Sequence, residues 1–146
     1  MIDADLRHTS SSKFFGMVKS PELVDFLLGN VSMQDAIKYN DEAKLWVLPA
    51  GSKTRNPADL IGSEPMKSFM AACKQNFDYV VIDAPPIGPV IDALILAQLV
   101  DKVVFVVRWA STARELVQQS VQRLPHDKLA GTVSRRVCRL RKCNRQ

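Results

Sequence analysis

Hydrophobic positions along the chain follow two different periods. Continuous apolar runs at residues 45–49, 79–82 and 103–107 are typical of short strands that are buried on both faces. Apolar residues recur at helical spacing over 64–77, which predicts an amphipathic helix. Because such strands alternate with helices, the pattern predicts an α/β fold, in which a mostly parallel sheet carries helices on both faces.

Capping residues and prolines predict where several helices begin. A side chain that caps the first turn, a proline in that turn, or an acid three residues later marks each start. The predicted starts are Ser20-Pro21, Ser32 with Asp35, Asn56-Pro57, and Thr112 with Glu115. We also expect a helix over 90–100, the end of a strand at 1–3 and the start of a last strand at Gly131.

The basic residues are concentrated at the end of the sequence. The 146 residues carry a formal charge of +5, but the last dozen residues hold six of the 20 lysines and arginines and no acid. Residues 1–134 therefore carry 14 basic against 15 acidic residues. We expect one domain over 1–133 and a basic, disordered tail over 134–146. A neutral domain with a basic tail has no nucleic-acid footprint, because a binding domain spreads its cations along one face.

The composition indicates a protein of a reducing compartment. Charged and polar residues interrupt the most hydrophobic region, 87–110, so no stretch reaches the roughly 18 residues that a membrane-spanning helix needs. Three cysteines cannot form a closed set of disulfides, and the first residues do not show the basic and then apolar pattern of a signal peptide. We therefore expect a soluble, cytoplasmic protein.

Three aspartates follow predicted strands. Asp3 and Asp5 follow the first strand, and Asp83 ends the run at 79–82. In an open parallel sheet, ligands bind at the carboxyl ends of the strands, and grouped carboxylates suit a hard cation such as Mg²⁺. The alternative is that each aspartate only caps the turn that follows it.

Four segments resemble elements of one family in the correct order. Met1-Ile2-Asp3-Ala4-Asp5-Leu6-Arg7 resembles the DxDxR Walker A′ motif of bacterial tyrosine kinases, and residues 77–86 (FDYVVIDAPP) resemble their Walker B element. Residues 45–51 and 56–63 resemble the strand-and-turn and NPxxLL-type segments that lie between these motifs. The resemblance covers about residues 1–133 and implies the fold of a P-loop nucleotide-binding domain from the proteins that control capsule and exopolysaccharide chain length.

The resemblance also implies roles for individual residues. Asp3 would be nearest the acceptor tyrosine and help to remove its proton, while Asp5 and Asp83 would hold Mg²⁺ directly or through water, with ATP as the phosphate donor. Arg7 would contact a phosphate or a neighbouring acid. Arg108 closes its strand at the edge of the expected site and is a weaker candidate for nucleotide binding.

The sequence departs from the family in three ways. No phosphate loop of the form G-x-x-x-x-G-K-[ST] occurs, so we expect a domain truncated before its first motif and with weak ATP binding. The tail from Ser134 replaces the apolar residue and asparagine with which the family continues its last strand, which suggests a shifted reading frame or, alternatively, a tail that touches anionic lipid. The family's C-terminal tyrosine cluster is absent, and we expect Tyr39 at the surface and Tyr79 in the core.

The leading hypothesis is an ATP-dependent protein-tyrosine kinase domain that regulates exopolysaccharide or capsule synthesis and export. The resemblance implies a membrane-embedded polysaccharide co-polymerase as partner, self-association, tyrosine-containing protein substrates, and a position at the inner face of the plasma membrane. Two alternatives remain open: a partitioning or septum-placement ATPase of the same superfamily, and a non-catalytic interaction module that keeps the kinase fold.

Overall fold

The computed structural model describes residues 1–8, 14–17, 22–51, 54–88 and 90–136. The chain divides into two compact units, Met1–Leu99 and Val100–Gln146, and each is described by itself. No helix in the described ranges is long and apolar enough to cross a membrane.

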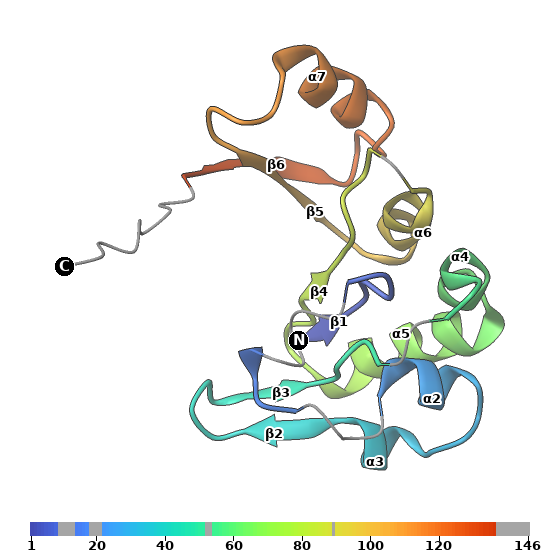
Figure 1. The fold of residues 1–146 in the computed structure, drawn as a ribbon. Helices are drawn as coiled ribbons and strands as arrows, with labels where there is room; N and C mark the ends of the chain where they lie inside the picture. The colour runs from blue at the N-terminus through green and yellow to red at the C-terminus, as the bar shows by residue number, and fades with distance from the viewer. Residues whose placement is uncertain (9–13, 18–21, 52–53, 89, 137–146) are drawn as a thin grey trace, which may run out of the picture. The chain divides into compact units, whose positions relative to one another are not determined.

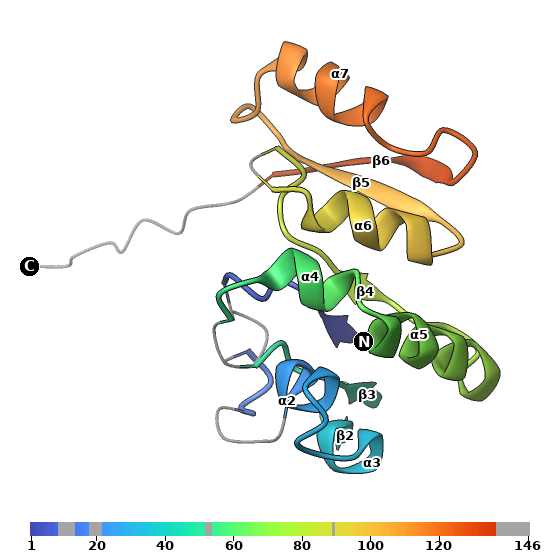
Figure 2. The same cartoon turned by 90° about the vertical axis from the view of Figure 1, so that its right-hand side faces the viewer.

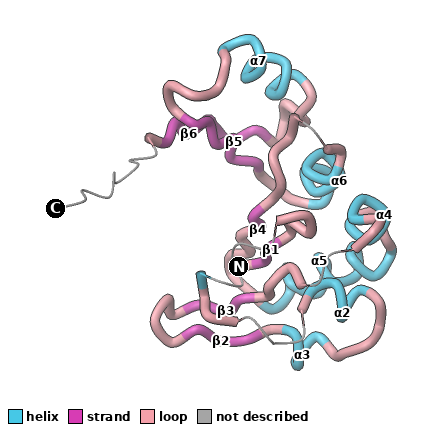
Figure 3. The backbone as a smooth tube through the Cα atoms, viewed as in Figure 1, coloured by secondary structure: helices cyan, strands magenta, loops and turns pink. Residues whose placement is uncertain are grey.

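The first unit holds two strand pairs and five helices among its described residues (Figures 1 and 3). Its elements are β1 (Ile2–Asp3), α2 (Leu23–Leu27), α3 (Met33–Ala36), β2 (Lys38–Asn40), β3 (Leu45–Val47), α4 (Pro57–Ile61), α5 (Glu64–Asn76), β4 (Ile82–Asp83) and α6 (Asp92–Leu99). The second unit consists of β5 (Val103–Arg108), α7 (Arg114–Gln122) and β6 (Leu129–Arg135).

Parallel pairing positions the first strand. β1 lies beside β4, with Ile2 opposite Ile82 and Asp3 opposite Asp83. On the other side of β1, the Asp3 N–H donates to the carbonyl oxygen of Leu48 at 2.9 Å. β5 and β6 also pair in parallel, as the sequence predicts. Each unit therefore contains one pair of parallel strands. In each pair, helices lie between the two strands in the sequence.

The core of the first unit forms around α5. Ser63 caps this helix by accepting a hydrogen bond from the Met66 N–H at 3.4 Å, and its buried face carries Met66, Phe69, Met70 and Cys73. The helix predicted over 64–77 is therefore confirmed. Burying side chains of this size contributes about 1.5–3 kcal/mol each. The α5 helix thus supplies much of the apolar surface on which this unit depends.

The strand predicted over 79–82 is shorter and more exposed than expected. Only Ile82 of this run lies in β4, while Tyr79 is 90% exposed and Val81 is 63% exposed. Burial on both faces requires neighbouring strands and two covering layers, and among the described residues β4 has only the two-residue β1 as a partner. The prediction that Tyr79 lies in the core was therefore wrong, whereas Tyr39 is exposed as expected.

The strand predicted over 103–107 is confirmed, but its burial is not. Exposure alternates along β5, where Val104 and Val106 are more than half exposed. Helix α7 lies over one face of the β5–β6 pair (Figure 1). Because only one covering layer is described in this unit, one set of alternate side chains stays in contact with solvent.

The predicted helix starts have different outcomes. The Ser32 hydroxyl accepts from the Asp35 N–H at 3.2 Å, and Pro57 occupies the first turn of α4, so both starts are confirmed. The capping box at Thr112 is not formed, because Thr112 N–H bonds back to Arg108 O and α7 begins after Ala113. The start at 20–21 lies outside the described residues.

A hairpin that the sequence did not predict joins β2 to β3. Its turn contains no glycine, which is the usual signal for such a connection. The Asn40 side chain instead accepts a hydrogen bond from the Ala43 N–H at 2.8 Å, and Lys44 adopts a positive φ of 54°. The Asn40 side chain therefore supports the turn, while Lys44 takes the positive φ for which glycine is the usual residue.

The last strand continues past the predicted domain boundary. β6 runs to Arg135, and the Trp109 N–H donates to the carbonyl oxygen of Arg135 at 2.9 Å. Ser134 and Arg135, which were assigned to the basic tail, therefore belong to the sheet. Arg136 follows the strand, and residues 137–146 of the predicted tail lie outside the described residues.

We predict that Gly51→Ala destabilises the protein far more than Gly29→Ala. Both glycines have a positive φ, of 100° and 78°, but a Cβ on Gly51 would lie 2.7 Å from the Glu22 Cβ, while one on Gly29 meets nothing within 4 Å. We expect Gly29→Ala to cost about 1 kcal/mol from backbone strain alone and Gly51→Ala to cost about 3 kcal/mol. Urea denaturation measures the free energy of unfolding of both variants. Equal losses would show that the contact with Glu22 adds no cost at Gly51.

Candidate functional site

Two aspartates stand opposite each other in the register of β1 and β4, at the ends of these strands. Asp3 and Asp83 are partners in the parallel register, and the Ala4 N–H donates to the carbonyl oxygen of Asp83 at 2.8 Å, which continues the pairing by one residue. Asp3 is buried at 1% exposure, while Asp83 is exposed. The structure thus brings together two of the three carboxylates that the sequence selects, at the strand ends where ligands bind in such sheets.

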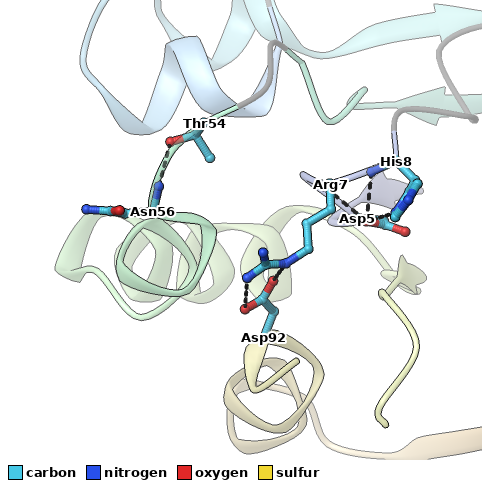
Figure 4. Close-up of polar contacts among 6 residues, drawn as sticks. All are labelled: Asp5, Arg7, His8, Thr54, Asn56 and Asp92. Carbon is cyan, nitrogen blue, oxygen red and sulfur yellow. Dashed lines mark hydrogen bonds and ion pairs between the residues drawn. The ribbon is translucent and has the colours of Figure 1, made fainter. Parts of the chain in front are cut away.

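Asp5 organises the loop that follows β1. Its Oδ1 accepts hydrogen bonds from the backbone N–H groups of Arg7 at 3.1 Å and His8 at 3.0 Å (Figure 4). The Asp5 N–H in turn donates to Asp3 Oδ1 at 3.1 Å. Both aspartates therefore fold the loop around their own carboxylates, which is the turn-capping role that strand-end aspartates commonly have. His8 remains at the surface, with its Nδ1 3.8 Å from Asp5 Oδ1.

Arg7 forms an ion pair with a residue distant in sequence. Its Nε lies 2.8 Å from Asp92 Oδ2 and its Nη2 lies 3.2 Å from Asp92 Oδ1, so the contact is bidentate (Figure 4). The Asp92 side chain is fully buried, while that of Arg7 is 38% exposed. The hydrogen bonds to Asp92 raise the pKa of the Arg7 guanidinium. The sequence left open whether Arg7 contacts a phosphate or an acid, and in the structure it pairs with an acid.

The sequence reasoning missed Asp92 as a partner in this site. In the sequence, Asp92 is one of the charged residues that interrupt the apolar region 87–110. One signal was present in the sequence: a single acid in an otherwise apolar helix is costly to bury unless a cation pairs with it. The sequence could not identify that cation, because 85 residues separate Arg7 from Asp92.

Arg108 lies in the second unit, at the end of β5. It is exposed, and its register partner in β6 is Arg135. A hollow of about 420 Å³ at this strand end is bordered by Arg108, Trp109, Thr112, Thr132 and Ser134, among others. Trp109 also lies under the guanidinium of Arg136, whose Cζ is 5.4 Å from the ring centroid. The nucleotide contact expected of Arg108 stays a prediction.

The first unit also has a hollow, and none of the predicted site residues borders it. It has a volume of about 400 Å³ and is bordered by apolar and aromatic side chains that include Trp46, Phe69, Cys73 and Phe77. Burial raises the pKa of the Cys73 thiol, which disfavours the reactive thiolate. None of the predicted site residues borders this hollow, so it offers no support for the kinase chemistry.

The carboxylates form an open arrangement, not a closed metal cage. Among the described residues, no group of three or more His, Cys, Asp and Glu side chains is placed to hold a metal ion. Mg²⁺ in nucleotide sites commonly takes one or two carboxylates and completes its shell with waters and phosphate oxygens. Asp5 is partly exposed and Asp83 is exposed, so their oxygens fit an open site of this kind, with one or two carboxylates.

Comparisons with known proteins agree with this fold. No family model matches the chain. It is 34% identical over 127 residues to the tyrosine-protein kinase CpsD of Streptococcus agalactiae, which covers 85% of this chain and 55% of that protein. It is 33% identical over 135 residues to the tyrosine-protein kinase YwqD of Bacillus subtilis, with coverage of 91% and 57%. The succinoglycan biosynthesis transport protein ExoP of Rhizobium meliloti is 33% identical over 138 residues, which span 91% of this chain and 18% of that protein.

Solved structures show the same similarity. The kinase domain of VpsO superposes with a TM-score of 0.88 at 29% identity, over 93% of this chain and 68% of that one. The kinase domain of the Escherichia coli tyrosine kinase ETK gives 0.88 at 26% identity, over 93% and 54%. The fold is thus that of an α/β kinase domain of the P-loop type, and the predicted fold class is confirmed.

The chain is homologous to bacterial tyrosine-protein kinases, as its motifs predicted, and to a succinoglycan biosynthesis transport protein. It spans about half the length of CpsD and YwqD and under a fifth of ExoP.

We predict that Asp5→Ala loosens the loop after β1, whereas Asp5→Asn preserves it. Alanine removes the acceptor for two backbone N–H groups, at a cost of about 1 kcal/mol, whereas asparagine retains a side-chain oxygen that supports the same turn. Urea denaturation and the amide chemical shift of His8 measure the two effects. An alanine variant as stable as the wild type, with an unchanged His8 signal, would show that the bonds to Asp5 do not hold this loop.

Proposed function

We propose that this chain provides the carboxylate side of a Mg·ATP-dependent protein-tyrosine kinase site that acts in exopolysaccharide or capsule synthesis and export. The observation that carries the proposal is the pairing of Asp3 with Asp83 at adjacent strand ends, in a chain whose homologues are named tyrosine-protein kinases. The named transport role of ExoP supports the link to polysaccharide export.

Each carboxylate has a distinct role in this proposal. Asp5 and Asp83 would hold Mg²⁺, directly or through water, because they are the more accessible oxygen donors at and after the strand ends. Such an ion would supply neutralisation of the negative charge on the phosphates of ATP. Asp3 accepts the proton of the tyrosine hydroxyl. Because Asp3 is buried at 1% exposure, the acceptor has to approach it from the strand ends.

The cationic part of a phosphoryl-transfer site is missing from the sequence. Phosphoryl transfer requires donors that cradle the phosphates, and no G-x-x-x-x-G-K-[ST] motif occurs in the 146 residues. Arg7 does not replace it in this structure, because its guanidinium is held in a bidentate contact with the buried Asp92 carboxylate. We therefore propose that this polypeptide by itself binds ATP weakly and transfers phosphate slowly.

The proposed partners rest on the resemblance of the motifs to the kinase family. The protein would work with a membrane-embedded polysaccharide co-polymerase that sets chain length, associate with further copies of itself, and phosphorylate tyrosines of protein substrates at the inner face of the plasma membrane. Tyr39 and Tyr79 are the only tyrosines in this sequence. Tyr79 is 90% exposed, so it is accessible to a kinase in a way that its apolar context did not suggest.

A second candidate function is a non-catalytic interaction module. It is favoured by the absence of a phosphate loop and of a terminal tyrosine cluster in a chain that keeps the kinase fold. Such a module would dock on a kinase or on its membrane partner without transferring phosphate itself. Nucleotide binding separates this candidate from the first.

We predict that Mg·ATP binds with a dissociation constant no lower than about 1 mM, whereas Mn²⁺ binds measurably and depends on the carboxylates. Calorimetry with Mg·ATP and Mn²⁺ titration followed by electron paramagnetic resonance measure the two affinities. Asp5→Asn with Asp83→Asn should abolish Mn²⁺ binding, and Asp59→Asn, which changes an exposed acid on α4, should leave it unchanged.

Two outcomes would contradict this account. A micromolar affinity for Mg·ATP would show that the phosphate loop is dispensable here and that the proposed weakness is wrong. Mn²⁺ binding that survives the double substitution would show that Asp5 and Asp83 are not the metal ligands.

A further inference from the structure

The Arg7–Asp92 ion pair has the features of a fixed structural link. The Asp92 carboxylate is fully buried, and both of its oxygens accept from the Arg7 guanidinium, at 2.8 and 3.2 Å. A buried carboxylate without a cation is strongly disfavoured, so each partner constrains the other. The planar guanidinium makes two parallel bonds that fix direction as well as distance, which a lysine cannot reproduce.

The Asp92 end of this pair is held by packed structure. Asp92 is the first residue of α6, where the dipole of the helix favours a negative charge. Leu96 and Ala97 of α6 are buried, and α6 packs against α4 (Figure 2). The Ile95 side chain of α6 lies 3.8 Å from where a Cβ on Gly62, the residue that follows α4, would be. The carboxylate is therefore presented from a rigid element.

The Arg7 end of the pair is bonded to the proposed metal-binding loop. The backbone N–H of Arg7 donates to Asp5 Oδ1 at 3.1 Å, and the N–H of Asp5 donates to Asp3 Oδ1 at 3.1 Å. A continuous series of contacts thus runs from Asp92 through the side chain and backbone of Arg7 to Asp5 (Figure 4). The hydrogen bond from the Asp5 N–H extends this series to Asp3. Moving the Arg7 side chain would move the N–H group that orients the Asp5 carboxylate.

We infer that Asp92 is a positioning residue of the proposed kinase site: through Arg7 it fixes the loop that carries Asp5, and it touches neither nucleotide nor acceptor. This inference rests on the proposed function for its link to metal binding. It assigns Arg7 to the same positioning role, in place of the phosphate contact that the sequence left open. It also connects the segment after the Walker B-like strand to the Walker A′-like motif, so both motifs depend on one buried contact.

Amide hydrogen exchange of the full chain tests the inference without any ligand. Asp92→Asn and Arg7→Lys each weaken the bidentate contact, and we expect exchange at the Arg7 and His8 amides to accelerate by about tenfold or more beyond any change that global stability explains. Glu64→Gln is the matched control, because it breaks the exposed Lys67–Glu64 pair on α5, whose atoms are 3.0 Å apart. This control should leave the loop unchanged.

Mn²⁺ affinity provides the second readout. We expect Asp92→Asn and Arg7→Lys each to weaken Mn²⁺ binding by about tenfold, and the double variant to lose little more than either single one, because all three break the same link. Loss of global stability with normal exchange at Arg7 and His8 would overturn the inference and leave the pair a purely structural contact. If Arg7→Lys lowered affinity for phosphate-bearing ligands while Asp92→Asn did not, Arg7 would be a phosphate ligand and the inference would be wrong.

The two readouts separate this inference from the proposed function. If the wild-type chain binds no Mn²⁺, the proposed metal site fails, and exchange at the Arg7 and His8 amides still decides whether Asp92 holds the loop. If Mn²⁺ binds but the loop exchanges normally in Asp92→Asn, the metal site stands and the positioning role fails.

Discussion

The parallel pairing of β1 with β4 is the contact on which the proposed site depends. This pairing covers only two residues on each strand, yet it sets Asp3 opposite Asp83 and directs the following loop across the strand ends. A shift of one residue would turn each aspartate to the opposite face of the sheet. The register is held from the other side as well, because Leu48 exchanges backbone hydrogen bonds with Met1 and Asp3.

The acids of the first unit that matter for the site fall into a buried and an accessible class. Asp3 and Asp92 are buried and act on the backbone or on a cation within the protein, whereas Asp5 and Asp83 reach solvent. Buried carboxylates are retained in proteins where hydrogen bonds or a paired cation compensate for lost hydration. The two classes therefore suit different roles: burial holds Asp92 against Arg7 and fixes the orientation of Asp3, the proposed proton acceptor, while the accessible acids remain open to a hard cation. A kinase site needs both, since positioning and charge neutralisation dominate phosphoryl transfer.

Local patterns predicted the elements that depend on local interactions. The α5 helix follows from its apolar spacing and from Ser63, and β5 follows from an unbroken apolar run. Burial was predicted poorly, because the exposure of Tyr79 and Val104 depends on which layers cover a strand, and no local pattern encodes that. Within the site, the positions of Asp3 and Asp83 followed from the rule on strand ends, while the Arg7–Asp92 pair joins residues too distant in sequence for any spacing rule.

The central claim is that the ends of β1 and β4 form a divalent-cation site, and paramagnetic broadening by Mn²⁺ in the amide spectrum of the full chain tests it most directly. The account predicts selective broadening at residues 3–8 and 83–84 at substoichiometric Mn²⁺, while amides of α5 and β6 stay sharp. Broadening that is uniform, or that is centred on other acidic residues, would contradict the site and with it the kinase chemistry proposed for this chain.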